Sequence, residues 1–404
     1  MPQSSVTPCH FLEQFILEER HDKLFLVDPS SGSIFNLNPM AGLFVELIQS
    51  GMQRDEIIQS IASQLSISDQ EVASDMDNLL DTISSGCQPR NDFFPDTMPV
   101  EAFTSTSLDQ PAENQIHRDD ILRKTPLQTK NYRINSKCFR ISCPDDAIFR
   151  LVHSQLQMMA VEPQTDAIHI EIEKGSNGFA IYVDGEIIQA TYSASWLDIL
   201  LIQLLIDESC RNECEWVSLH AAALANKTGQ TVLFAAPSGS GKSTLAVNLA
   251  LDGFTYLGDD TVIVDTEKRT VIPFPTAANL KPGSWEVFID SIPELAQSEV
   301  FRENTRPVKF AALPEHQNRK PPDNVIHGLI FPRYQHDSTG LMRKLAASET
   351  WSRLNSARVY IHSEMAGHVY RDLIDLIESL PSYYLEYSSY RQAKSLINRL
   401  LSSQ

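Results

Sequence analysis

The 404-residue sequence predicts an α/β chain of α+β organisation, with a small N-terminal domain and a larger core. In the core, the apolar run Thr231–Ala236 is followed by a Gly- and Ser-rich loop and then by an amphipathic helix. Near the N-terminus, strand-like segments within residues 10–36 precede three helix-like segments. The first is predicted to begin after Asn38 as its N-cap, the second to span about residues 54–65, and the third to begin with a capping box of Ser68 and Glu71.

Between these two parts, alternation of polar and apolar residues predicts an antiparallel sheet region with one helix. Its predicted strands are residues 131–141, 168–172 and 179–183, and its predicted helix spans residues 195–208.

The loop after Thr231–Ala236 carries a phosphate-binding pattern. Ala236 is followed after four residues by Gly241, Lys242 and Ser243, which is the spacing of a P-loop between a strand and a helix. Gly239 and Gly241 allow a sharp turn that points backbone N–H groups at an anion, Lys242 adds a positive charge, and the Ser243 hydroxyl is suited to Mg²⁺. The predicted nucleotide-binding residues are Ala236, Pro237, Ser238, Gly239, Ser240, Gly241, Lys242, Ser243 and Thr244.

Two carboxylates and one histidine flank this loop in the sequence. Asp259 and Asp260 follow a predicted strand, so one can hold Mg²⁺ while the other accepts a proton from an attacking hydroxyl. An ordinary turn without a chemical role is the alternative for this pair. His220 begins a strand expected beside the P-loop strand, and it is equally consistent with a role in the site and with a plain structural histidine.

The segments Leu219–Ala222, Ala236–Ser243 and Leu257–Asp260 together resemble the core of the HPr kinase/phosphorylase family. The resemblance implies a P-loop fold of the HPr kinase and phosphoenolpyruvate carboxykinase type, which transfers a phosphoryl group from ATP to a serine hydroxyl. It further implies that Asp259 is the catalytic base, that Asp260 and Ser243 serve Mg²⁺, that Lys242 binds phosphates, and that His220 supports the site.

The chain departs from that family at two places. Thr244 stands where these kinases usually carry an acidic residue, and the family's Pro-Gly-Arg-Asn-type loop is not evident, with Lys281–Ser284 lying nearest to it. HPr as a substrate and reverse phosphorolysis are therefore both in doubt. Arg306 and Arg333 are candidates to stabilise charge in the transition state.

The N-terminal segment 1–85 has the outline of a winged-helix domain, with a small sheet followed by three helices. A DNA-binding role conflicts with its charge, because residues 39–84 contain eight acidic side chains and Arg54 as the single basic one. The stretch 21–42 resembles PqqD-like domains, which recognise precursor peptides in ribosomal-peptide modification. The resemblance implies that a leader peptide adds as a strand to the edge Gly32–Leu37, with the third helix as a wall. A purely structural or oligomerising domain is the alternative.

Composition and charge limit the partners and the kinds of site that the chain is expected to have. The net charge of −19 argues against nucleic acid and anionic membranes as partners, and no apolar stretch is long enough to span a bilayer. Six cysteines without a Cys-x2-Cys pair argue against a zinc site and fit a reducing cytoplasm. Residues 86–115 are predicted to be a Pro- and Ser-rich linker, and residues 116–404 a catalytic domain, with a leading sheet region at 116–215 and the P-loop core at 216–404.

These expectations combine into one leading hypothesis. The chain is predicted to use ATP and Mg²⁺ to phosphorylate a Ser or Thr hydroxyl of a precursor peptide held by its N-terminal domain. The alternatives are a kinase for a small or carrier-bound hydroxyl, and a nucleotide-gated peptide chaperone without catalysis. Whether the chain forms a homo-oligomer stays open.

Overall fold

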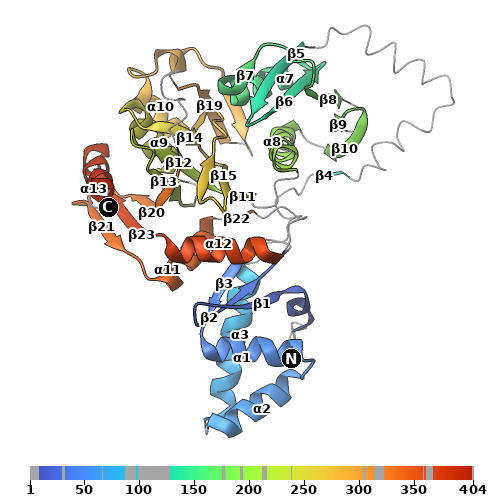
Figure 1. Cartoon of the computed structure of the whole chain (residues 1–404), viewed down its shortest axis with the longest axis vertical. Helices are drawn as coiled ribbons and strands as arrows, with labels where there is room; N and C mark the ends of the chain where they lie inside the picture. Colours follow the sequence, from blue (N-terminus) through green and yellow to red (C-terminus); the bar gives the residue numbers. More distant parts are fainter. Residues whose placement is uncertain are drawn as a thin grey trace, which may run out of the picture.

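The computed structural model describes residues 9–29, 32–65, 67–86, 97–98, 128–174, 178–191, 194–211, 216–237, 239–303, 306–313, 323–357, 359–360 and 367–402. These residues form a mixed arrangement of helices and sheets. In Figure 1 the N-terminal domain, in blue, lies below helix α12, and the core and a middle sheet lie above that helix.

The N-terminal domain contains a three-stranded antiparallel sheet and three α-helices, as the sequence predicted. Its elements are a 3₁₀ turn at Cys9–Gln14, β1 (Ile16–Arg20), β2 (Lys23–Val27), β3 (Ile34–Leu37), α1 (Pro39–Gln49), α2 (Arg54–Leu65) and α3 (Asp69–Gly86). Two predicted helix starts are confirmed. The Asn38 side chain accepts from the N–H of Ala41, and Ser68 and Glu71 bond reciprocally in a capping box.

The middle region forms a sheet with the strand order β4-β10-β9-β8-β6-β5-β7. Its elements are β4 (Thr97–Met98), β5 (Gln128–Ile134), β6 (Lys137–Cys143), α7 (Asp146–Leu156), a 3₁₀ turn (Gln157–Met159), β7 (Ala160–Val161), β8 (Ile168–Lys174), β9 (Phe179–Val183), β10 (Glu186–Thr191) and α8 (Ala194–Cys210). Strand β4 lies inside the predicted linker, whose other described residue is Gly86, at the end of α3; the rest of the linker is outside the described residues.

Three expectations for this region were wrong. The single strand predicted over 131–141 is a hairpin, because Asn135 turns the chain at φ 53°. The sheet is not wholly antiparallel, since β6 and β8 run parallel. A second helix, α7, had been missed although Asp145 caps it through the N–H groups of Ala147 and Ile148.

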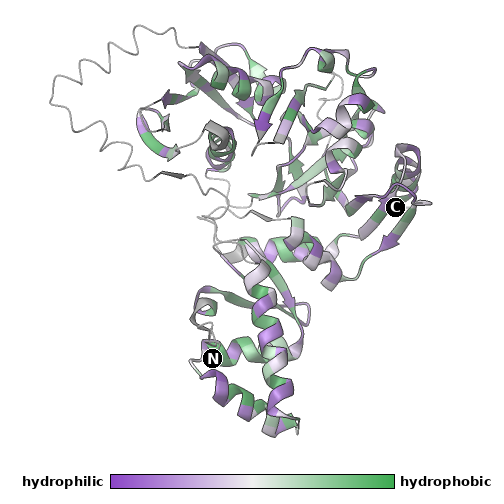
Figure 2. Ribbon diagram, turned by 180° about the vertical axis from the view of Figure 1, so that it is seen from behind, coloured by the Kyte–Doolittle hydropathy of each residue, from purple (hydrophilic) through white to green (hydrophobic). Residues whose placement is uncertain are grey.

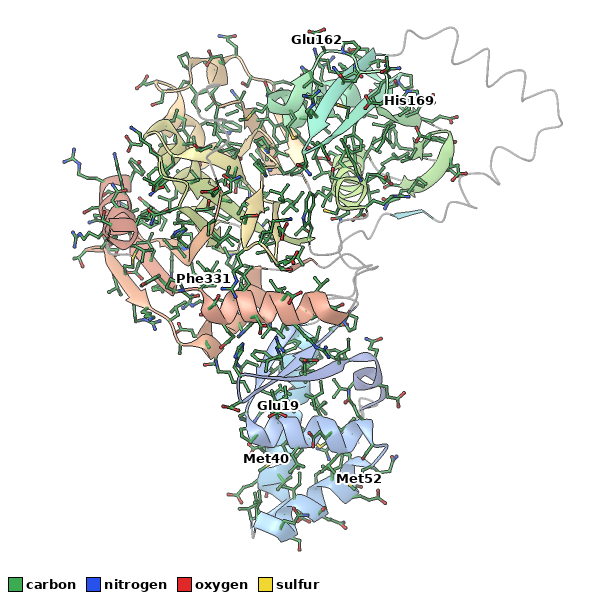
Figure 3. The ribbon with its side chains drawn as sticks, viewed as in Figure 1. Glu19, Met40, Met52, Glu162, His169 and Phe331 are labelled. Atoms are coloured by element: carbon green, nitrogen blue, oxygen red, sulfur yellow. The ribbon has the colours of Figure 1, made fainter. Side chains whose placement is uncertain are left out.

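The core contains two sheets, with strand orders β14-β12-β13-β20-β23-β21 and β16-β15-β11-β22. Their strands are β11 (Trp216–Leu219), β12 (Ala221–Ala225), β13 (Thr231–Ala235), β14 (Thr255–Gly258), β15 (Val262–Asp265), β16 (Thr270–Ile272), β20 (Ile326–Tyr334), β21 (Leu341–Lys344), β22 (Val359–Tyr360) and β23 (Ser382–Tyr387). Strand β12 reads Ala-Ala-Ala-Leu-Ala and is completely buried. Phe331 of β20, labelled in Figure 3, belongs to the same buried cluster as Val369 of α12.

Helices and a small third sheet complete the core. They are α9 (Lys242–Leu251), β17 (Ala278–Leu280), α10 (Pro282–Phe288), a 3₁₀ turn (Pro293–Ala296), β18 (Phe301–Glu303), β19 (Arg306–Ala311), α11 (Ala347–Ala357), α12 (Gly367–Ser379) and α13 (Tyr390–Ser402). Figure 2 shows hydrophobic residues along the central strands and mixed faces on the N-terminal helices. In the part of the chain that the structure describes, no helix has the length and apolar character needed to cross a membrane.

The N-terminal sheet is buried on both faces, which the sequence had not indicated. Successive side chains of a strand point to opposite faces, and Leu26 packs with the N-terminal helices whereas Phe25 and Val27 pack with the core. The Phe25 ring meets Trp351 of α11 edge-on, with ring centroids 5.7 Å apart. The N-terminal domain is therefore docked on the core through its own sheet.

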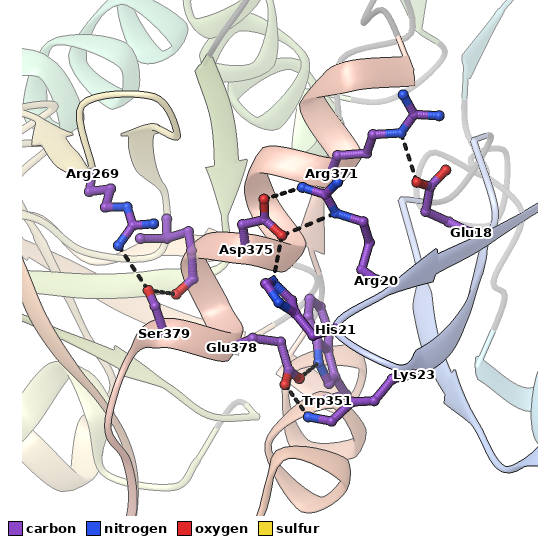
Figure 4. Close-up of polar contacts among 11 residues, drawn as sticks. Glu18, Arg20, His21, Lys23, Arg269, Trp351, Arg371, Asp375, Glu378 and Ser379 are labelled. Carbon is purple, nitrogen blue, oxygen red and sulfur yellow. Dashed lines mark hydrogen bonds and ion pairs between the residues drawn. The ribbon is translucent and has the colours of Figure 1, made fainter.

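Polar contacts surround this docked surface, as Figure 4 shows. Asp375 of α12 accepts hydrogen bonds from Arg20 and His21 at the β1–β2 turn. Glu378 binds both Lys23 and the indole N–H of Trp351. Farther along α12, Arg371 pairs with Glu18 at 2.7 Å.

Candidate nucleotide site and N-terminal groove

Strand directions explain why three separated segments meet at one edge of the core sheet. Strand β12 runs antiparallel to both β13 and β14, so the start of β12 lies beside the ends of the other two. His220 immediately precedes β12, Ala236 immediately follows β13, and Asp259 immediately follows β14. The fold therefore gathers the predicted phosphate loop, the histidine and the two carboxylates at the same edge.

The phosphate loop depends on two glycines in the left-handed region. Gly239 has φ 87° and Gly241 has φ 92°, a conformation that costs other residues free energy. A Cβ atom on Gly241 would also come within 2.8 Å of the Tyr387 hydroxyl and 3.2 Å of Cβ of Tyr334. The Tyr387 hydroxyl donates to the carbonyl of Gly241 at 3.2 Å, and the N–H of Tyr334 donates to the carbonyl of Ser240 at 2.9 Å.

Lys242 is the positive charge at the centre of this site. Its side chain is only 5% exposed, and its Nζ lies 3.1 Å from Oδ1 of Asp260 and 3.8 Å from Oδ1 of Asp259. Nζ also lies 3.3 Å from Nε2 of His220, whose Nδ1 is 2.7 Å from the carbonyl oxygen of Asp260. Because a carbonyl only accepts, Nδ1 carries the proton, and neutral His220 accepts from the ammonium through Nε2.

The environment separates the pKa values of the two carboxyl groups. Burial and the neighbouring Asp260 raise the pKa of Asp259 to about 6, against the opposing effect of Lys242 and Ser243. Desolvation would also raise the pKa of Asp260, but the charge and hydrogen bond of Lys242, together with the charge of Lys281, outweigh it, and the pKa falls below its ordinary value. A carboxylate with a pKa near neutrality is suited to accept a proton, and one with a low pKa is suited to stay charged.

Two further features mark these carboxylates as unusual. Oδ2 of Asp259 is buried and has no hydrogen-bond partner among the described residues, so its position favours an additional ligand or proton. Asp260 adopts φ 62°, which is strained for a residue with a side chain. Its own N–H donates to Oδ1 of Asp259 at 2.9 Å, so the strained turn fixes the two carboxyl groups relative to each other.

The donor set fits ATP with Mg²⁺. The loop N–H groups and Lys242 suit phosphate oxygens, and Ser243 with the two carboxylates supplies oxygen ligands of the kind that Mg²⁺ prefers. Within the described residues no three His, Cys, Asp or Glu side chains converge to hold a metal. That finding is compatible with Mg²⁺, which usually keeps several waters and takes only one or two protein carboxylates.

The other predicted site residues differ in their exposure and contacts. Pro237 is exposed at the loop, and Ser238 lies outside the described residues. Thr244 directs its hydroxyl to the hydroxyl of Ser284 at 2.7 Å, which links α9 to α10. Arg333 is exposed on β20, and the side chain of Arg306 lies outside the described residues.

Sequence reasoning missed two residues that shape this site. Tyr334 and Tyr387 flank the phosphate loop with ring centroids 5.8 Å apart. The two tyrosines end strands far along the chain, so no local spacing connects them to the loop. Lys281, which the sequence had placed in the segment nearest to the substrate loop of the kinases, contributes positive charge near Asp260.

A second hollow lies beside the N-terminal sheet. It is a cavity of about 740 Å³ between the edge of β3, the start of α1, helix α3 and helix α11 of the core. The predicted peptide edge at residues 32–37 and the predicted wall on α3 both border it. The presence of α11 on its third side had not been predicted.

Comparison with known proteins bears on this second region. Residues 23–85 match the family model described as coenzyme PQQ synthesis protein D (PqqD). The match supports the prediction of a PqqD-like domain at the N-terminus. No curated protein matches the chain.

Proposed function

We propose that the chain is an ATP-dependent kinase that phosphorylates a hydroxyl group of a peptide. The observation that carries this proposal is the gathering of Lys242, His220, Asp259 and Asp260 at the edge where the phosphate loop begins α9. The order of these motifs also resembles that of HPr kinase/phosphorylase. A phosphate loop alone would favour only nucleotide binding, whereas the paired carboxylates favour transfer to a hydroxyl.

Each residue has a role that follows from its environment. Bound ATP with Mg²⁺ would supply the transferable phosphoryl group and neutralise the charge on its oxygens. Lys242 and the loop N–H groups hold the phosphates, and Ser243 and Asp260 hold the cation. Asp259, with its raised pKa, takes the proton from the acceptor hydroxyl. His220 accepts from Lys242 and so orients the ammonium.

The N-terminal domain supports a peptide as the substrate. The match to the PqqD model covers β2, β3 and the three helices, and β3 is an edge strand of its sheet. An edge strand binds an extended peptide through its backbone groups. We therefore infer that the domain captures the leader of a ribosomally made precursor and that the core phosphorylates a Ser or Thr in the same peptide.

The test is a mass measurement. The purified chain is incubated with ATP, Mg²⁺ and the precursor peptide encoded beside its gene, and phosphorylation adds about 80 Da to the peptide. Omission of Mg²⁺ and substitution of Asp259→Asn should both prevent the gain. Tight peptide binding without any gain would refute the kinase and favour a nucleotide-gated chaperone. Phosphorylation of a free hydroxyl compound in place of the peptide would indicate a small-molecule kinase.

A further inference from the structure

We propose that core helix α11 is the third wall of the peptide groove, so that a bound peptide contacts the N-terminal domain and the core together. This inference rests on the proposed peptide-binding function and specifies how that function involves the core. It starts from the side chain of Asn355, which lies on α11 and reaches the edge of β3.

The side chain of Asn355 forms hydrogen bonds with the backbone of the outer edge of β3 at one residue, Ile34. Its side-chain N–H₂ donates to the carbonyl of Ile34 at 2.7 Å, and its side-chain oxygen accepts from the N–H of Ile34 at 3.2 Å. One amide group thus makes both bonds that the backbone of an added strand would make. Asn355 thereby ends the free edge at Ile34.

The free edge continues beyond Ile34. In an antiparallel ladder, outward-facing backbone groups recur at every second residue, so Asn36 presents its N–H and C=O to the same side as Ile34. Asn36 borders the cavity, as does Asn355. An extended peptide can therefore pair with Asn36 and is blocked from pairing at Ile34.

The cavity beside this edge has walls from both parts of the chain. Helix α3 contributes Asp75, Asn78, Leu79 and Thr82, and α11 contributes Ser348, Ser352, Asn355 and Ser356. The serines recur at four-residue spacing, which places them on one face of α11 toward the cavity. A peptide that fills the cavity next to β3 must therefore touch α11.

The chemistry of the cavity favours an extended and partly basic peptide. Phe35, Leu37 and Phe44 give it an apolar part, which suits alternate side chains of a strand. Asp75 is the charged residue among those that line it, and residues 39–84 of the N-terminal domain carry eight acidic side chains and one basic one. A peptide with a Lys or Arg facing Asp75 would complement that charge.

A binding experiment tests the third wall. Random 20-residue peptides displayed on phage are selected on the full chain, and the selected peptide is synthesised with a fluorescein label. Its affinity is measured by fluorescence anisotropy for the unmodified chain, for Ser352→Trp on α11 and for Asn78→Trp on α3. Both positions are exposed and line the cavity, so an indole at either one would occupy part of the groove and obstruct a peptide there.

We expect each of these substitutions to weaken binding by about tenfold or more. Ser63→Trp, at an exposed position on α2 away from the cavity, should stay within about twofold of the unmodified chain. Thermal melting of the three variants checks that each one is folded.

Weakening by Asn78→Trp alone would overturn the role of α11 and leave the proposed peptide-binding function intact. Binding that survives both substitutions would exclude this groove as the peptide site. A selection that yields no binder would count against peptide recognition itself, and so against the peptide substrate in the proposed function as well as this inference.

Discussion

The phosphate-loop edge and the N-terminal groove are assembled in different ways. His220, Lys242 and Asp259 lie within 40 residues of sequence and meet because three neighbouring strands begin or end at one edge. The groove instead joins Ile34 to Asn355, which are 321 positions apart. The first site is internal to one sheet, whereas the second exists only while two parts of the chain are docked.

Because the two regions are assembled differently, substitutions in them should affect different properties of the protein. Substitutions at the phosphate-loop edge should affect chemistry with little effect on docking, because Lys242 and Asp259 contact each other and their immediate neighbours. Substitutions at the docked surface should affect stability and peptide capture, because Phe25 and Trp351 bury apolar area between the two parts.

The largest expected effect is on catalysis. Asp259→Asn removes the proposed proton acceptor, and we expect phosphoryl transfer to fall by about 10²- to 10⁴-fold, with peptide affinity unchanged. Steady-state kinetics and anisotropy measure the two quantities. Asp337→Asn, at a side chain that is 92% exposed, is the matched control and should keep full activity. A variant at Asp259 with normal turnover would refute the assignment of the base.

The next effect is on the docked surface. Phe25 is fully buried against Trp351, so Phe25→Ala should lower the free energy of unfolding by about 3–5 kcal/mol. Urea denaturation measures this loss, and Val287→Ala at an exposed position is the control. Nucleotide affinity of the folded variant should be unchanged. A large loss of nucleotide affinity would show that the two regions are coupled and not independent.

A smaller effect is expected where Asn355 meets β3. Asn355→Leu removes both hydrogen bonds to Ile34 and leaves its N–H and C=O without those bonds, which should cost about 1–3 kcal/mol of stability. Asn398→Leu on the exposed face of α13 is the matched control. Equal unfolding midpoints for the two variants would mean that water replaces Asn355 at no cost.

The smallest expected effect is the loss of stability in acid that follows from protonation of Asp375. Burial raises the pKa of Asp375, but Arg20 and His21 outweigh it and hold the pKa below its ordinary value of 3.8. The ionised carboxyl therefore stabilises the docked form above that value, and the contribution is lost as pH falls through the lowered pKa. Because the pair is partly exposed, the loss should be about 1 kcal/mol or less.

Denaturation of the unmodified chain and of Asp375→Asn at several pH values measures that contribution. The stability difference between them should be present at neutral pH and should vanish in acid. Asp290→Asn, at an exposed position, should show no such convergence. A difference that grows in acid would contradict the direction assigned to the pKa of Asp375.

Sequence patterns that act within one turn of helix predicted the helices of the N-terminal domain well. The bounds of α2 agree with the predicted helix, and the caps at Asn38 and Ser68 are formed as expected, because these patterns act within one turn of helix. The hairpin at Asn135 was missed since its flanking residues continue the alternation of a single strand. Helix α7 was missed although Asp145 offers a clear cap.

Of the two candidate sites, the phosphate-loop edge follows from local sequence patterns, whereas the contact between β3 and α11 does not. Strand, loop and helix in sequence order were enough to predict the phosphate loop and the acidic turn after β14, because their positions follow from adjacent strands. The contact between Ile34 and Asn355 could not be predicted, since neither residue carries a pattern that identifies a partner so distant in the chain. Composition alone did not show that the sheet around Phe25 is buried on both faces.

Strand β12 has a consequence for how far the phosphate loop tolerates substitution. The small side chain of Ala222 on this strand packs in the same cluster as Leu245 and Leu249 of α9. A larger residue at Ala222 would have to displace α9 outward, and the first turn of that helix carries Lys242. The placement of the lysine relative to the carboxylates thus depends on the size of one alanine side chain beneath the helix.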